Sequence, residues 1–122
     1  MAGACLLVAG TALALATPDF TLSWTHSVER TGWHEAWRVA DGALVLREFR
    51  LRGSGAGMEP GPDARLVDGW WVSPGGGLSV PRLDLAASGA TGDGWTLCAD
   101  GTCRPVGAAP GAPVTIAPCP GR

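Results

Sequence analysis

Hydrophobic and polar side chains alternate along the chain from position 20, which is the pattern of a β-strand with one buried face and one wet face. The even positions from Phe20 to Val28 carry Phe, Leu, Trp, His and Val, and the odd positions between them carry Thr and Ser. Further strands are predicted over residues 33–40, 43–52, 69–73, 78–87, 94–99, 102–106 and 114–117. The sequence therefore predicts an all-β fold, an antiparallel meander closed into a small barrel or sandwich.

An Asp-Gly pair at 41–42 predicts a tight reversal, because these two residues tolerate the positive φ angles of a type I′ hairpin turn. A two-residue turn at this point places Trp37 opposite Leu46. It also places Glu35 opposite Glu48, and two acids in that position repel each other. We therefore expect a positive group to lie between them.

A four-residue loop over residues 29–32 would place His26 opposite Glu35 on the same sheet face. This register predicts a face with an apolar part and a polar end. The polar end would comprise His26, Trp33, Glu35, Glu48 and Arg50. A bulge that shifts the register by one residue would separate these side chains, since successive residues of a strand point to opposite faces.

Two cysteines flank a second Asp-Gly turn, at 100–101. A two-residue hairpin there makes Cys98 and Cys103 a non-hydrogen-bonded cross-strand pair, the pair whose side chains approach most closely. A disulfide between them is predicted, with reduced thiols as the alternative; a zinc site is disfavoured because the spacing is not CxxC. No partner for Cys119 is predicted.

The N-terminal segment 4–16 is apolar and carries no charge. It is too short for a helix that crosses the hydrocarbon core of a membrane, and it ends in the small-x-small pattern that signal peptidase accepts. Residues 1–16 are therefore predicted to be a signal peptide or an N-terminal membrane anchor, although no basic residue precedes the apolar stretch. An apolar first strand of a cytosolic domain is the other alternative.

Composition limits the remaining possibilities. The chain has 122 residues, so residues 17–122 are expected to form a single β domain with a loose Pro/Gly-rich tail. The net charge is −2, and the nine basic residues, all Arg, are interspersed with acids. No basic field exists to bind a nucleic-acid backbone, so nucleic acid is not an expected partner.

The candidates for chemistry are few. Ser27 lies next to His26 in the sequence, but on a strand the two side chains point to opposite faces. No GxSxG motif occurs either. A small hydrolase is therefore the third hypothesis, after an interaction module and a ligand-binding protein. His26, Glu35 and Glu48 could hold a metal ion, yet two histidines in the chain are a weak signal. The plainer alternative is structural, with His26 hydrogen-bonded to Glu35 and Arg50 paired with Glu48. We expect no catalysis and no cofactor.

Several sequence blocks resemble the signature of the domain of unknown function 1850 family. These are Phe20-x-Leu22-x-Trp24-x-His26-Ser27-Val28-Glu29, Trp33-x-Glu35-x-Trp37, Gly55-Ala56-Gly57-Met58-Glu59 and Gly69-Trp70. The resemblance runs from Phe20 to about Val106. Members are commonly encoded beside TRAP transporters of the TAXI type, which import small organic anions in prokaryotes. The resemblance implies that the protein is a bacterial accessory of solute uptake, located in the periplasm or otherwise outside the cytoplasm.

These observations lead to one functional expectation with an alternative. The protein is expected to be a non-catalytic interaction module whose partner is the permease or the solute-binding protein of a TAXI-type system. It would contact a membrane only through an uncleaved N-terminal segment. The alternative is a stand-alone β-barrel protein that binds a small ligand or a metal. The expected working surface comprises His26, Glu29, Trp33, Glu35, Glu48, Arg50 and the loop residues Gly55, Ala56, Gly57, Met58 and Glu59.

Overall fold

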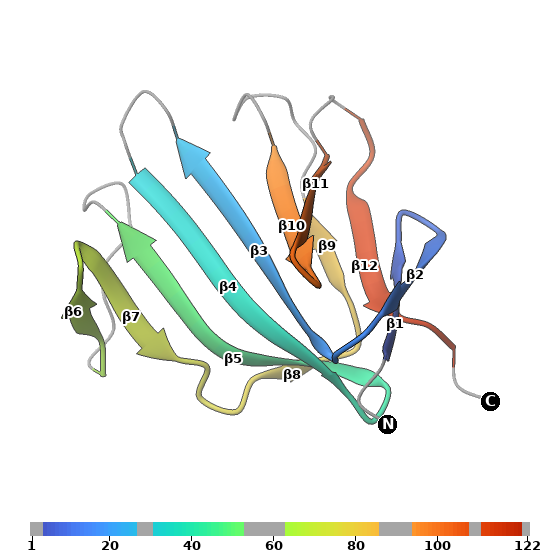
Figure 1. Cartoon of the computed structure of the whole chain (residues 1–122), viewed down its shortest axis with the longest axis horizontal. Helices are drawn as coiled ribbons and strands as arrows, with labels where there is room; N and C mark the ends of the chain where they lie inside the picture. The colour runs from blue at the N-terminus through green and yellow to red at the C-terminus, as the bar shows by residue number, and fades with distance from the viewer. Residues whose placement is uncertain (1–3, 27–30, 53–62, 86–93, 108–110, 121–122) are drawn as a thin grey trace.

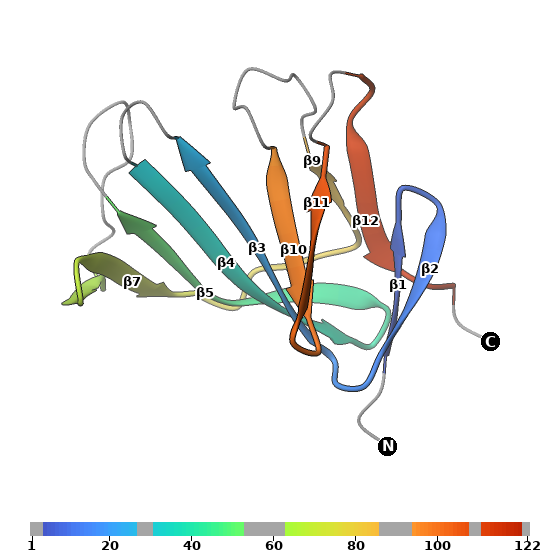
Figure 2. The same cartoon turned by 45° about the horizontal axis from the view of Figure 1, so that its top comes forward.

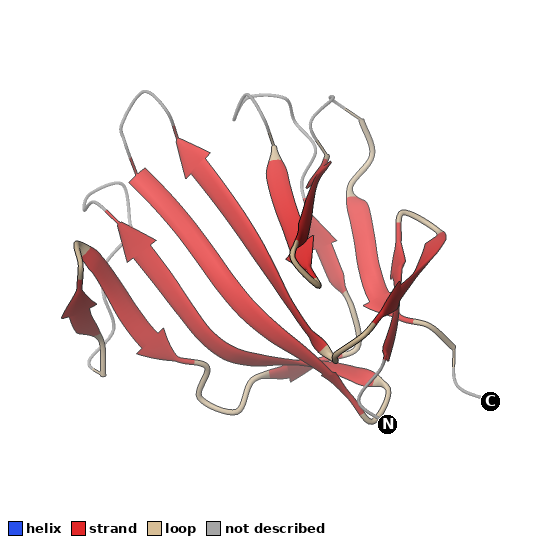
Figure 3. Ribbon diagram, viewed as in Figure 1, coloured by secondary structure: helices blue, strands red, loops and turns tan. Residues whose placement is uncertain are grey.

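The computed structural model has an all-β fold built from antiparallel sheets, as the alternating pattern predicts (Figures 1 and 3). It describes residues 4–26, 31–52, 63–85, 94–107 and 111–120. The strands in these ranges are β1 (Ala4–Val8), β2 (Thr11–Leu15), β3 (Asp19–His26), β4 (Thr31–Ala40), β5 (Ala43–Arg52), β6 (Arg65–Val67), β7 (Trp70–Pro74), β8 (Ser79–Val80), β9 (Leu83–Leu85), β10 (Trp95–Ala99), β11 (Thr102–Val106) and β12 (Val114–Pro118). Those ranges contain no helix long and apolar enough to cross a membrane.

The strands form two sheets. The larger sheet has the order β11-β10-β3-β4-β5-β7-β6, with β8 added beside β5, and the smaller has the order β2-β1-β12-β9. Figures 1 and 2 show β6 and β7 at one end of the molecule, with β1, β2 and β12 at the other. The β3-β4-β5 meander is therefore the middle of the larger sheet, and it carries most of the residues predicted to be functional.

Both predicted Asp-Gly turns are confirmed. Asp41 and Gly42 have φ angles of 51° and 75°, and Asp100 and Gly101 have φ angles of 54° and 77°. Positive φ at both central residues gives a backbone twist that matches the twist of the flanking strands. Cys98 lies opposite Cys103, and the predicted disulfide between them is present.

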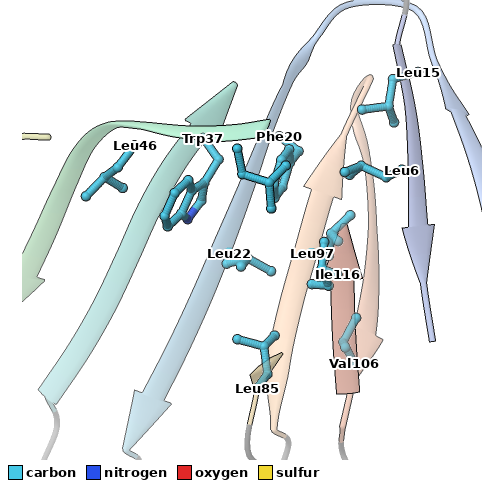
Figure 4. Packing of buried hydrophobic residues seen from close by; sticks show 11 residues of the cluster. Leu6, Leu15, Phe20, Leu22, Trp37, Leu46, Leu85, Leu97, Val106 and Ile116 are labelled. Atoms are coloured by element: carbon cyan, nitrogen blue, oxygen red, sulfur yellow. The ribbon is translucent and has the colours of Figure 1, made fainter. Parts of the chain in front are cut away.

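The hydrophobic core lies between the two sheets (Figure 4). Phe20 and Leu22 of β3 and Leu97 of β10 meet Ile116 of β12 there, and each is at most 1% exposed. Trp37 of β4 is 3% exposed and belongs to the same cluster. One face of β3 and β4 is consequently an inner face toward the core, and the other is an outer face.

The N-terminal apolar segment forms a hairpin of the smaller sheet. β1 pairs with both β2 and β12, and Leu6 and Leu15 are 0% and 5% exposed in the core. Cys5 forms a disulfide with Cys119, the cysteine for which no partner is predicted from the sequence. A first strand is one of the three alternatives that the sequence leaves open for this segment. Whether the segment is cleaved stays a prediction.

Candidate functional site

The pairing of β3 with β4 differs from the predicted register by four residues. His26 lies opposite Thr31, and Glu35 lies opposite Leu22 rather than His26. The predicted register is wrong because it would have placed Phe20 opposite a residue of the Asp41-Gly42 turn. In the structure Phe20 lies opposite Trp37, so both side chains are buried in the core.

A β-bulge between β4 and β5 separates the predicted polar cluster. Trp37 lies opposite Leu46 as predicted, but Ala36 lies opposite Glu48, which leaves Arg47 as an extra residue. Glu35 therefore lies opposite Phe49, and the expected Glu35–Glu48 pair is wrong. Because each residue beyond the bulge changes face, Glu48 and Arg50 lie on the outer face while Glu35 stays on the inner one.

A glycine after β7 accommodates the bulge. The Gly75 N–H donates a hydrogen bond to the Arg47 carbonyl oxygen at 2.9 Å. A Cβ atom at position 75 would lie 1.9 Å from the Leu46 carbonyl oxygen, so only glycine allows this approach. The backbone at the bulge is thus determined by a contact from a residue about 30 positions further along the chain.

Part of the predicted working surface lies outside the described residues. These residues are Glu29, Gly55, Ala56, Gly57, Met58 and Glu59. For His26 the backbone pairing is described, but the side chain is not. The described members of the predicted surface are therefore Trp33 and Glu35 on the inner face and Glu48 and Arg50 on the outer face.

On the inner face, Glu35 accepts hydrogen bonds from two tryptophans of its own strand. Trp33 Nε1 donates to Oε2 at 2.6 Å, and Trp37 Nε1 donates to Oε1 at 2.8 Å. Residues at i−2, i and i+2 of a strand share a face, so the Trp-x-Glu-x-Trp spacing contains the signal for this arrangement. Trp33 also stacks on Phe49, with ring centroids 5.5 Å apart.

On the outer face, arginines and carboxylates form exposed ion pairs. Arg38 and Arg47 both contact Asp19 Oδ1, at 3.0 Å and 3.5 Å, and Arg50 contacts Glu48 at 2.7 Å, which confirms the predicted Arg50–Glu48 pair. A groove of about 280 Å³ lies beside Asp19, Arg47 and Glu48, and it is also lined by Phe20, Thr21, Ala36 and Trp37.

The charges on the outer face perturb two titrating groups. The hydrogen bond from Arg38 lowers the pKa of the Asp19 carboxyl below its usual 3.8, so this carboxyl is ionised at neutral pH. Burial lowers the pKa of His34 below its usual 6.5, and the positive charge of Arg50 acts in the same direction. His34 lies opposite Arg50 and is neutral at neutral pH.

The outer arginine face is defined as Arg38, Arg47, Arg50 and Arg52, and in the part of the chain that the structure describes these arginines outnumber the carboxylates paired with them. Arg52 lies opposite Gly32 and over the ring of Trp70, 5.9 Å from its centroid. Among the described residues, Asp19 and Glu48 are the carboxylates that pair with this set, so the described part of the surface has a formal surplus of positive charge. Such a surface is suited to an anionic group or an acidic protein surface.

A comparison with protein families matches one family described as a domain of unknown function (DUF1850), over residues 20–106. The match begins in β3 and ends in β11, so it includes both faces of the β3-β4-β5 meander. No curated protein and no solved structure gave a significant match. With more than half of its length matched, the chain belongs to the domain of unknown function 1850 family.

Proposed function

We propose that the protein is a non-catalytic, extracytoplasmic interaction module that assists a TAXI-type TRAP uptake system. Its partner is the permease or the solute-binding protein of that system. Membership of the domain of unknown function 1850 family supports this reading through the genomic association expected for such proteins. The working surface of the module is the outer arginine face.

The proposal rests mainly on the exposed arginine side chains beside the β-bulge. The side chains of Arg38 and Arg47 are 45% and 54% exposed, although both pair with Asp19. Exposed ion pairs contribute little to folding stability, about 0–1 kcal/mol each. Such arginines can exchange Asp19 for carboxylates on a partner, and planar guanidinium groups are well suited to bidentate contacts with carboxylates.

The two disulfides favour a location outside the cytoplasm. Cys5–Cys119 and Cys98–Cys103 are both bonded, and the structure holds no free cysteine in the residues it describes. Disulfides persist in oxidising compartments and are rare in the reducing cytosol. The disulfides bear on the location of the protein and not on the choice of partner.

A binding measurement with matched arginine variants tests the proposal. The purified protein is titrated against the purified solute-binding protein and against the permease in lipid nanodiscs, both from the organism that encodes the chain. We expect saturable binding to one of them, with an affinity that falls as salt is raised because exposed charges are screened.

The double variant Arg47→Gln with Arg50→Gln should bind at least tenfold more weakly. Arg82→Gln is the matched control, because Arg82 is also exposed and paired with a carboxylate, Asp84, but lies between β8 and β9. Absence of binding to both components, or an equal loss in the control, would overturn the proposal.

The alternative is a stand-alone protein that binds a small ligand, and the carboxylate of Glu35 between two indoles favours it. A metal site is the other form of this alternative. Within the described ranges, no three His, Cys, Asp or Glu side chains lie together in a way that could hold a metal ion. Elemental analysis of the purified protein separates these readings, because stoichiometric metal would favour the stand-alone protein.

A further inference from the structure

Glu35 is an acidic residue on a face that is otherwise largely aromatic and aliphatic. It lies in the middle of β4, opposite Leu22 on β3 and Phe49 on β5, and it is partly buried. Trp33 and Trp37 each donate an indole N–H to one of its oxygens. These two bonds orient the carboxylate in the folded protein without any help from a ligand.

The indoles orient this carboxylate but do not neutralise it, because an indole N–H is an uncharged donor. The ion pairs in the described part of the chain join arginines to Asp19, Glu48 and Asp84, and none of them includes Glu35. Carboxylates removed from water are normally paired with a positive group. The inner face therefore presents a negative charge that the described residues do not balance.

The aromatic rings around Glu35 favour a cation as well. Trp33 stacks on Phe49 with an interplanar angle of 20°, and Trp24 lies opposite Trp33 on β3. The face of an aromatic ring attracts positive charge, and the attraction grows when the cation is shielded from water. Carboxylate and rings together suit an alkylammonium group, whose nitrogen carries charge and whose carbons are apolar.

A second polar group lies on the same face, on the far side of Phe49. Ser73 is opposite Phe49 and only 4% exposed, and its hydroxyl oxygen has no hydrogen-bond partner among the residues that the structure describes. Because neighbouring strands are separated by about 4.8 Å, Ser73 and Glu35 are about 10 Å apart across Phe49. A buried hydroxyl without a partner is unfavourable, so a polar group of a ligand would be stabilised there.

We propose that the inner face between Glu35 and Ser73 binds a small organic ammonium ligand. The charged nitrogen binds Glu35, the carbon chain packs on Phe49 and Trp33, and a terminal hydrogen-bonding group reaches Ser73. A metal ion is not the fitting occupant, because hard cations need several oxygen ligands and the described residues offer no cluster of three such groups. This site is on the face opposite the outer arginine face, so it is independent of the proposed partner contact.

Nuclear magnetic resonance of the indole N–H groups tests the site with defined probes. In the intact protein, hexylammonium should shift the Trp33 and Trp37 indole resonances in a saturable way. Hexanol, the uncharged probe of equal chain length, should not. No saturable shift, or equal shifts with both probes, would overturn the proposal without any variant being made.

Two substitutions then locate the ends of the ligand. Glu35→Gln should weaken hexylammonium binding at least tenfold, and Glu48→Gln, which removes a carboxylate from the outer face, should leave it unchanged. Aminohexanol should bind more tightly than hexylammonium, and Ser73→Ala should abolish that difference. Equal binding in Glu35→Gln contradicts the ammonium site, and an unchanged preference in Ser73→Ala contradicts the role of the hydroxyl.

Discussion

Cys5 and Cys119 are joined by a disulfide although they are 114 positions apart in the chain. The same two residues share a backbone hydrogen bond, from Cys119 N–H to the Cys5 carbonyl oxygen at 3.0 Å. The bond joins β1 to the residue that follows β12 and so closes nearly the whole chain into a loop. The N-terminal hairpin is consequently linked to the domain by covalent, hydrogen-bonded and apolar contacts.

Removal of this disulfide should destabilise the fold more than removal of the short one. On the chain-entropy account, a bridge that closes a loop of more than 100 residues contributes about 5 kcal/mol, and one across a hairpin contributes about 2 kcal/mol. We expect Cys5→Ser with Cys119→Ser to lower the free energy of unfolding by more than Cys98→Ser with Cys103→Ser. Urea unfolding of the two double variants measures the difference, and the reverse order would contradict this account.

A chain that begins at Thr17 should be less stable than the full chain. It loses Leu6 and Leu15 from the core, and burial of each leucine contributes about 2 kcal/mol. It also leaves Cys119 with a thiol that reacts with a thiol reagent. Thermal unfolding followed by circular dichroism tests the stability, and a truncated chain as stable as the full one would show that β1 and β2 are dispensable. The intact mass of the exported protein then tells whether the segment is cleaved.

Gly75→Ala should disrupt the bulge on β5. The new Cβ atom would collide with the Leu46 backbone, which cannot move aside as a flexible side chain can, so we expect a loss of about 3 kcal/mol or more. Gly111→Ala is the control, because nothing lies within 4 Å of a Cβ atom there. Urea unfolding midpoints are measured for both variants. Equal midpoints would mean that the bulge does not need glycine at position 75.

Protonation of His34 should destabilise the folded state. Its folded-state pKa lies below the usual 6.5, chiefly because of burial and also because of Arg50, while Glu48 and Glu35 act weakly in the opposite direction. The unfolded chain therefore binds more protons between the two pKa values, and stability falls as the pH is lowered through 6.5 toward the folded-state pKa. His34→Gln should reduce this slope in urea unfolding at pH 7.5 and 5.5. An unchanged slope would assign the pH dependence to other groups.

The local features of the fold could be predicted from the sequence. Most of the strands from β3 onward and the two reversals at Asp41-Gly42 and Asp100-Gly101 follow from alternation and from residues that tolerate positive φ, whereas β6 was not predicted and the strand predicted over 78–87 is divided into β8 and β9. The Cys98–Cys103 bond follows from the second turn. Each of these depends on residues only a few positions apart, so the sequence pattern contains the needed information.

The features that depend on distant residues could not be predicted. The bulge at Arg47 involves Gly75, and the β3–β4 register depends on burying Phe20 against Trp37. The hairpin of β1 and β2 resembles an apolar leader because it is hydrophobic and has no charge, although Ala9-Gly10, with φ angles of 52° and 84°, marks its turn. A single extra residue on β5 was enough to divide the predicted cluster between two faces.

The division of the cluster between two faces is the central claim, and one paired binding measurement tests it most directly. The affinity for the transporter component is measured for the wild type, for Arg47→Gln with Arg50→Gln, and for Glu35→Gln under the same salt conditions. We expect the outer-face variant to bind at least tenfold more weakly and the Glu35 variant to match the wild type. A loss of affinity in Glu35→Gln with none in the arginine variant would contradict the account.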